Sequence, residues 1–433
     1  MRRLLLITLS VTLVSKLEGQ TGSRLQVEID RRARELESKV VAWRRDFHQN
    51  PELSNREFRT SKIVAEHLQK LGMEVKTGVA HTGVVGVLKG GKPGPVVALR
   101  ADMDALPVTE EVDLPFKSTA KGQYNGQEVG VMHACGHDNH VAILMGVAEM
   151  LSAMKADLPG TVKFIFQPAE ENPPPGEEGG APMMLKEGVF DSPKVDAIFG
   201  LHVFPMEVGH IEYRSGGLMA SSDNFYINVR GRQTHGALPW NGVDPIVAAS
   251  QIVLGIQTLT SRQTDLTLTP AVVTVGIMRG GIRTNIVPDS VEMAGTIRTF
   301  DERVRAQLHE RLTKTAEAIA SASGATATVS IQKMAPVTYN NPALTDRMIP
   351  TLERVLGKDR VKVGQPTTTA EDFAYYQQAV PGLFFFIGGT PKDRLGQAAP
   401  NHSPRFFVDE GVLVPGMRAL ASLAVDYLSA PRP

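Results

Sequence analysis

The sequence is poor in cysteine, since Cys135 is the only one among 433 residues. A single thiol cannot close an internal disulfide, so a disulfide framework is excluded. Neither charge sign is in excess, because 46 Lys and Arg residues balance 46 Asp and Glu residues. A chain without a net field does not attract polyanions, so we expect no nucleic-acid partner. The length and the 42% hydrophobic content suit a globular protein of two or three domains.

A mostly apolar segment occurs near the N-terminus, over residues 4–14, directly after two arginines. A basic start followed by a short apolar run is typical of a secretory signal, and the run is too short to span a bilayer comfortably. We therefore expect a signal peptide over residues 1–19, with Ser15 and Gly19 as candidate cleavage sites, and export to the periplasm or the exterior. An uncleaved anchor is the alternative. We expect no integral membrane domain.

Strands and helices alternate through much of the chain. A helix is predicted over residues 140–154, with Asp138 or Asn139 as its N-cap. Buried strands are predicted where short runs are apolar nearly throughout, at 95–101, 161–166, 195–201 and 382–389. Such strands, alternating with helices, indicate an α/β domain with a mostly parallel sheet.

Residues 217–335 show a different pattern, in the order strand, helix, strand, strand, helix, strand. This order is that of a ferredoxin-like α+β unit. Because the earlier pattern resumes at 382–389, the unit is predicted to be inserted into the α/β domain. That domain then consists of residues 24–216 and 336–433.

Polar residues that can bind metal follow the predicted strands. They also fill "MHACGHDNH" (132–140), which opens the predicted helix and contains Cys135 and His137. The strand-end residues are Asp102, Asp104, Glu170, Glu171, His202 and His402. Alone, each has an ordinary interpretation, such as a turn aspartate or a solvated acidic pair. In open α/β sheets, however, ligands bind outside the carboxyl ends of the strands, so we expect these side chains to meet at one edge.

The chemistry of this set is that of a transition-metal site. Imidazole, thiolate and carboxylate suit zinc, manganese, nickel or cobalt. The adjacent Glu170 and Glu171 can have different roles. One can bind metal, and the other can accept a proton from a water molecule whose pKa the metal has lowered.

The chain also carries a series of short motifs: RRDFHQNPELS, LRADMDALP, MHACGHD, QPAEE, GLHV, GRQTHGALP, TNIVPDS, AEDFAYY and NHSP. In this order they resemble the aminoacylase-type two-metal metallopeptidases and amidohydrolases, which include hippurate hydrolases, N-acyl-amino-acid amidohydrolases and plant auxin-conjugate hydrolases. The match runs from about His48 to Phe407.

The resemblance implies a catalytic domain with two divalent metal ions (Zn, Mn, Ni or Co) and an inserted lid and dimerisation domain. Glu170 would be the general base and later the general acid, and Asp104 would orient a ligand. Asp102 is left out of the ligand set. The ligands implied are Cys135 (bridging the two ions), His137, Glu171, His202 and His402.

In the inserted domain, the resemblance implies that His235 reaches an active site, often that of the partner subunit, and that Asn285 contacts substrate. His48, His133 and His140 also match family positions and are interpreted as structural or as supporting the ligand residues. A homodimer or higher oligomer is implied. The loop 172–182 departs from the family pattern through its three consecutive prolines.

The function expected is hydrolysis of the amide bond of small N-acyl amino acids. An exopeptidase or dipeptidase would use the same chemistry. Two alternatives belong to other classes. One is a thiol enzyme with Cys135 as nucleophile, which leaves the other ligand-type residues unexplained. The other is a non-catalytic receptor, which would be marked by loss of Glu170 or of the ligands.

Overall fold

The computed structural model describes residues 24–430, so the predicted signal peptide at 1–19 lies outside the described residues. The chain divides into two compact units. Unit 1 comprises the described parts of Met1–Ser215 and Tyr376–Pro433 together with Asn340–Gly364, and unit 2 comprises Gly216–Tyr339 and Gln365–Tyr375.

The assignment of residues 365–375 to unit 2 differs from the expectation from the sequence. The sequence places these residues in the second part of the α/β domain, 336–433. The backbone explains the difference, because the N–H of Ala220 donates to the carbonyls of Thr367 (3.1 Å) and Thr369 (3.0 Å). These bonds tie the segment to the first residues of unit 2.

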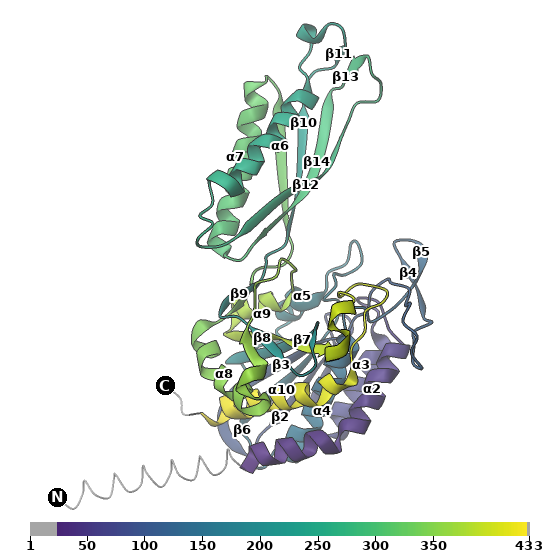
Figure 1. Ribbon diagram of the computed structural model, residues 1–433, viewed down its shortest axis with the longest axis vertical. Helices are drawn as coiled ribbons and strands as arrows, with labels where there is room; N and C mark the ends of the chain where they lie inside the picture. The colour runs from purple at the N-terminus through teal and green to yellow at the C-terminus, as the bar shows by residue number, and fades with distance from the viewer. Residues whose placement is uncertain (1–23, 431–433) are drawn as a thin grey trace, which may run out of the picture. The chain divides into compact units, whose positions relative to one another are not determined.

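Unit 1 is built on an eight-stranded sheet in the order β1-β2-β6-β3-β7-β18-β8-β17. Figure 1 labels β2, β3, β6, β7 and β8 of this sheet. The central strands β6, β3, β7 and β18 run parallel to one another, so the predicted mostly parallel α/β sheet is confirmed. The strand bounds are β1 Glu74–Val79, β2 Gly83–Lys89, β3 Lys92–Asp102, β6 Pro159–Gln167, β7 Ala197–Glu207, β8 Ile211–Tyr213, β17 Val361–Val363 and β18 Gly382–Thr390.

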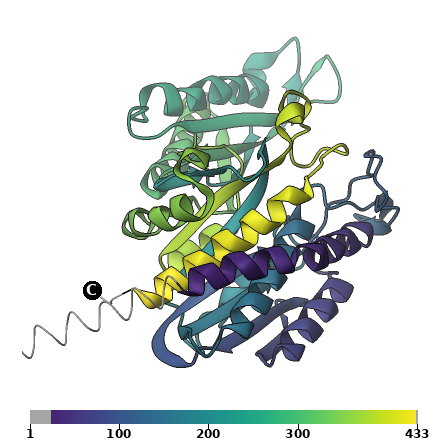
Figure 2. The same cartoon turned by 60° about the horizontal axis from the view of Figure 1, so that its bottom comes forward.

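The helices of unit 1 follow a helical segment at residues 24–35. They are α2 Glu37–Gln49, α3 Phe58–Lys70, α4 His137–Ala153, α5 Gly180–Lys186, α8 Pro342–Leu356 and α10 Leu413–Ser429, while α9 Phe373–Ala379 holds residues of both units. Helices α2, α4 and α10 pack against one another, and α4 and α10 cover β3 and β7. Figure 2 shows α10, in yellow, beside the purple N-terminal helices. The smaller elements are the hairpin β4 Lys121–Tyr124 and β5 Gln127–Gly130, and the 3-10 turns η2 Lys358–Arg360, η3 Lys392–Gln397 and η4 Glu410–Val412.

Helix α4 lies at the centre of this core, and its residues are buried on nearly every side, including Val141, Leu144 and Leu151. A helix that is apolar all round belongs inside a protein. Glu410–Ser429 is the one helix among the described residues that is long and apolar enough to cross a membrane. Of the 18-residue window that meets this criterion, 67% is buried inside the structure, as in a core helix.

Helix α4 begins earlier than the sequence predicts. Its N-cap is Gly136, not Asp138 or Asn139. The carboxylate of Asp138 is engaged elsewhere, because Oδ2 lies 3.0 Å from Arg44 Nε and 2.9 Å from His48 Nδ1. Gly136 has a φ of 90°, and a Cβ there would lie 2.3 Å from Val203 Cγ2. Only glycine therefore fits this turn, which places His137 first in the helix.

Strand β7 also extends further than predicted. The sequence places His202 at the end of a strand, but β7 continues to Glu207. The neighbouring strand β18 explains the extension, because its residues pair with β7 from Gly382↔Ile198 to Thr390↔Glu207, with His202 opposite Phe386.

Unit 2 contains a four-stranded antiparallel sheet in the order β12-β14-β10-β15, with helices α6 and α7 packed on it (Figure 1). Its elements follow the predicted order: β10 Asp223–Arg230, α6 Pro245–Arg262, β12 Ala271–Gly280, β14 Ser290–Thr299, α7 Glu302–Ala322 and β15 Thr326–Lys333. Smaller elements are β9 Gly216–Met219, β11 Thr234–His235 paired with β13 Ile286–Val287, and the 3-10 turn η1 Pro239–Asn241. β9 pairs with β16 Thr338–Asn340, whose last residue belongs to unit 1. A second apolar core, including Phe225, Ile252 and Leu312, fills the space between sheet and helices.

The conformation of Gly136 predicts that a substitution at this turn destabilises the protein. Gly136→Ala should lower the free energy of unfolding by about 1–2 kcal/mol for the left-handed backbone, and by a further ~1–3 kcal/mol for the overlap with Val203. Gly72→Ala is the matched control, because Gly72 has a φ of 74° but nothing within 4 Å of the added Cβ. Urea unfolding of the metal-free proteins measures both. Equal losses in the two variants would contradict the role given to Val203.

Candidate metal centre

His137 is held in one orientation at the start of α4. Its Nδ1 lies 2.8 Å from the backbone carbonyl oxygen of Asp104, two residues after the end of β3. A carbonyl oxygen only accepts, so Nδ1 carries a proton and donates it. The other nitrogen, Nε2, is buried without a hydrogen-bond partner and lies 3.7 Å from Asp102 Oδ2 and 3.9 Å from Glu170 Oε2. A buried imidazole nitrogen facing carboxylates is well suited to a cation.

His202 has the same arrangement on β7. Its Nδ1 donates to the carbonyl of Val203 at 2.8 Å, and its Nε2 lies 3.3 Å from the Sγ of Cys135. Burial lowers the pKa of His202 well below its usual value, and the neighbouring His140 and His137 lower it further. His202 is therefore a neutral imidazole, the form that binds metal.

His140 has no nitrogen left for a metal, although it lies one helical turn from His137. Its Nδ1 lies 2.6 Å from Asp102 Oδ1, and its Nε2 accepts the N–H of Val203 at 2.9 Å. Asp102 is also engaged on its other oxygen, since Arg100 Nη1 lies 2.7 Å from Oδ2. The contacts of His140 and Asp102 are those of side chains that hold β3, α4 and β7 together.

His402 and Glu171 come from the segments that follow β18 and β6, and their side chains meet. His402 Nε2 lies 3.0 Å from Glu171 Oε1. The loop that carries His402 is fixed to the start of α4, because the His402 N–H donates to the carbonyl of Ala134 at 2.8 Å. The side chain of the preceding Asn401 donates to the carbonyls of Cys135 (3.3 Å) and Val203 (3.4 Å) and lies 3.7 Å from the Cys135 sulfur.

Asp104 fixes the backbone of the two glutamates. Its Oδ1 accepts the N–H of Glu170 at 3.1 Å, and its Oδ2 accepts the N–H of Glu171 at 2.9 Å and the hydroxyl of Ser54 at 2.7 Å. Burial opposes ionisation of Asp104, but the hydrogen bond with His137 and these donors hold its pKa below the usual value. An ionised Asp104 is therefore available to orient Glu170 and Glu171.

The five predicted ligands fall into two groups that can each hold a metal ion and that share one residue. One group is Cys135, His137 and His202, and the other is Cys135, Glu171 and His402; within each group the donor atoms lie within 4.8 Å of one another. A further group contains His137, Glu170 and Glu171. The shared position of Cys135 is what a bridging ligand requires.

The charge state of the site also favours a cation. Burial raises the pKa of the Cys135 thiol well above its usual value, and Glu171, Glu170 and Asp102 raise it further. Burial would lower the pKa of His137, but Asp102 and Asp104 raise it to about 10. The same carboxylates that retain these protons would attract a divalent ion in their place. A thiol with a raised pKa is a poor nucleophile, which argues against a thiol enzyme.

His235 and Asn285 lie next to each other in unit 2. His235 is exposed and pairs with Ile286 across β11 and β13, while the carbonyl of Asn285 accepts the N–H of Gly236 at 2.8 Å. The Nδ1 of His235 accepts the N–H of Ala237 at 3.0 Å. In its neutral form His235 therefore carries its proton on Nε2, where it can be donated to a ligand.

Sequence reasoning missed two residues that hold the site. Asn401 is one; its place beside His402 in "NHSP" was the available signal. Glu57 is the other; its side chain accepts the N–H of Ala169, directly before the two glutamates, and no sequence pattern marks that contact.

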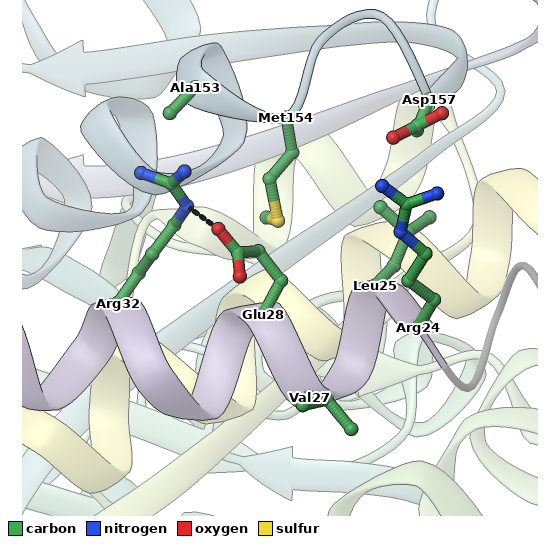
Figure 3. Close-up of a pocket in the computed structure, with 8 residues that line it drawn as sticks. All are labelled: Arg24, Leu25, Val27, Glu28, Arg32, Ala153, Met154 and Asp157. Carbon is green, nitrogen blue, oxygen red and sulfur yellow. Dashed lines mark ion pairs between the residues drawn. The ribbon is translucent and has the colours of Figure 1, made fainter.

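A cavity of about 580 Å³ lies elsewhere in unit 1 (Figure 3). Charged side chains of the first helical segment, Arg24, Glu28 and Arg32, line it together with Met154 and Asp157. None of the predicted site residues lines it, so it does not belong to the metal-type groups.

A mostly parallel sheet that brings sulfur, nitrogen and carboxylate donors together, with Glu170 beside them, is an arrangement suited to a metal-dependent hydrolase. Residues 98–426 match the family model "Peptidase family M20/M25/M40". The chain belongs to this family and is a metallo-hydrolase of the amidohydrolase and peptidase type.

Three similar proteins cover most of the chain. Thermostable carboxypeptidase 2 of Saccharolobus solfataricus is 43% identical over 91% of this chain and 96% of its own. N-acetyl-L-cysteine deacetylase of Bacillus subtilis is 38% identical over 88% of this chain and 86% of its own. A crystal structure from Bacillus subtilis, described as a dinuclear metal binding peptidase from the M20 family, has a TM-score of 0.77 at 35% identity and covers 91% of this chain and 99% of its own.

The raised pKa values predict a pH-dependent metal affinity. His137, with a pKa of about 10, and the Cys135 thiol both hold protons at neutral pH and must lose them to bind. The association constant should therefore rise with pH, by about tenfold per pH unit for each proton displaced. Calorimetric titration in buffers of different ionisation enthalpy counts those protons. An affinity that does not change between pH 6 and 8 would contradict the assignment.

Proposed function

We propose that the protein hydrolyses the amide bond of N-acyl amino acids and that two divalent ions, of zinc, manganese, nickel or cobalt, serve the reaction. The observation that carries the proposal is the pair of donor groups that share Cys135. A relative named N-acetyl-L-cysteine deacetylase supports the substrate class, and a structural neighbour described as dinuclear supports the number of ions.

Cys135, His137, Glu171, His202 and His402 would hold the ions. The orientation of His137 and His202 supports this, because each donates Nδ1–H to a backbone carbonyl and directs Nε2 toward the other donors. Bound ions would acidify a water molecule and polarise the scissile carbonyl.

Glu170 would carry the proton. Its carboxylate lies 3.9 Å from His137 Nε2, its side chain is 9% exposed, and its backbone is fixed by Asp104. From there it would accept a proton from the attacking water and deliver it to the leaving amine nitrogen. In unit 2, His235 Nε2–H is a suitable donor to the developing oxyanion, and Asn285 beside it would contact substrate.

An exopeptidase is the second candidate, supported by the relative named carboxypeptidase. The two candidates share every step and differ in what lies on the acyl side of the amide. A substrate panel that includes dipeptides separates them. A non-catalytic receptor is not supported, because Glu170 and all five ligand-type residues are present.

We further propose that unit 2 forms a homodimer through β12. This strand lies at one edge of its sheet, and its side chains Val272, Ile277 and Met278 are 42%, 43% and 41% exposed. An exposed apolar edge strand is a template for pairing with another chain.

The proposed chemistry predicts the behaviour of Glu170→Ala. The variant should keep two ions per chain, because Glu170 is not among the proposed ligands, while kcat on N-acetyl amino acids should fall by about 10²–10⁴-fold. Metal analysis and a panel of N-acetyl and N-benzoyl amino acids, with and without chelator, measure both. Unchanged turnover in Glu170→Ala would remove it from the role of base, and full activity in a metal-free protein would overturn the mechanism.

The proposed dimer predicts that Ile277→Lys weakens association, because a lysine on an edge strand opposes strand pairing. Sedimentation velocity should show a shift from dimer to monomer. Val27→Lys is the control, since Val27 is 67% exposed in unit 1 and the same charge is added. A dimer that persists in Ile277→Lys would place the interface elsewhere.

A further inference from the structure

Ala169 occupies an unusual backbone conformation directly before the two glutamates. Its φ is 53°, in the left-handed region, and the residue is 1% exposed. This conformation carries a free-energy cost for any residue with a Cβ. Something in the surrounding structure must therefore stabilise it.

Glu57 makes the contact that does so. Its side chain is fully buried at the start of α3, and its Oε1 accepts the N–H of Ala169 at 2.9 Å and the N–H of Asn55 at 3.0 Å. Its Oε2 accepts the hydroxyl of Thr82 at 2.5 Å. Thr82 and Asn55 thus fix the carboxyl group, and the carboxyl group in turn fixes Ala169.

Three consecutive backbone N–H groups are held by two carboxyl groups. Glu57 takes the N–H of Ala169, while Asp104 takes those of Glu170 and Glu171. The turn at Ala169 is what allows the chain to leave β6 and present its next two N–H groups to Asp104. The direction of the Glu170 and Glu171 side chains depends on that turn.

The turn is also enclosed by its neighbours. A Cβ added at Gly179 would lie 3.1 Å from the Cβ of Ala169 and 2.8 Å from Asn55 Oδ1. A Cβ added at Gly83 would lie 3.1 Å from Cδ of Pro168, the residue before Ala169. The loop has little room to adopt another path, so loss of the Glu57 contact would move it by a small distance.

We propose that Glu57 is a positioning residue, which keeps Ala169 in the left-handed conformation and so aims Glu170 at the reacting water and Glu171 at the metal site. This inference rests on the proposed hydrolytic function. It assigns to Glu57 an effect on turnover and metal binding that a residue serving stability alone would not have.

The test is a double-mutant cycle between Glu57 and Ala169 in the purified, metal-loaded protein. Glu57→Met keeps the length of the side chain but removes both acceptors. Glu57→Gln keeps one side-chain oxygen that can accept both N–H groups. Its amide NH2 can donate a hydrogen bond to the hydroxyl oxygen of Thr82. Ala169→Gly lets the turn form without strain, because glycine adopts a positive φ at no cost.

We expect Glu57→Met to lower kcat by roughly 10²-fold, the effect of a small misplacement of catalytic groups, with little change in KM. Glu57→Gln should stay close to the wild type. Adding Ala169→Gly to Glu57→Met should recover about tenfold, which corresponds to the cost of the left-handed conformation that glycine does not bear. Non-additivity of this kind is the signature of coupling between the two residues.

If Glu57→Met is too unstable to purify, Thr82→Val takes its place, since it removes only the hydroxyl that holds Oε2. A several-fold loss of kcat that Ala169→Gly recovers is the expected result. The inference is overturned if Ala169→Gly recovers nothing, or if Glu57→Gln and Glu57→Met lose turnover equally.

A wild-type protein inactive on every N-acyl amino acid and dipeptide would refute the proposed function and not the positioning role. In that case the affinity for Mn²⁺ is measured for each protein of the double-mutant cycle in place of kcat. Because Glu171 is a proposed ligand on the same turn, Glu57→Met should weaken binding and Ala169→Gly should restore it. Unchanged affinity in Glu57→Met would contradict the role of Glu57 independently of activity.

Discussion

The candidate site depends on the hydrogen bonds that Asp104 makes just after the end of β3. Its carboxylate holds the backbone of Glu170 and Glu171 after β6, and its carbonyl accepts the Nδ1–H of His137 at the start of α4. One residue thus joins three segments that are far apart in the sequence. The parallel sheet makes this possible, because β3 and β6 end side by side, with Asp102 opposite Gln167.

Burial gives the site its electrostatic character. Asp102, Asp104 and Cys135 lie in the interior of unit 1, where an uncompensated charge is costly. Arg100 compensates Asp102, whereas the proton of His137 compensates the carboxylates around it until a cation replaces that proton. The arrangement therefore holds several acids close together at a cost in stability, and metal binding would relieve that cost.

The sequence predicted the elements whose patterns are local. The apolar strands, the buried helix α4 and the six elements of unit 2 follow from hydrophobic periodicity. The residues after β3 and β6 meet because these parallel strands end side by side, whereas His202 lies within β7. The start of α4 and the length of β7 did not follow, because they depend on the ion pair of Asp138 with Arg44 and on the pairing of β7 with β18. The contact of Glu57 with Ala169 joins residues 112 positions apart, so no local pattern reveals it.

The central claim is that Cys135 is a metal ligand. X-ray absorption spectroscopy of the zinc-loaded protein tests it most directly, because a thiolate ligand lies at about 2.3 Å and scatters differently from nitrogen and oxygen. The account predicts a sulfur scatterer in the wild type that disappears in Cys135→Ser. A first coordination shell of nitrogen and oxygen alone in the zinc-loaded wild type would contradict it.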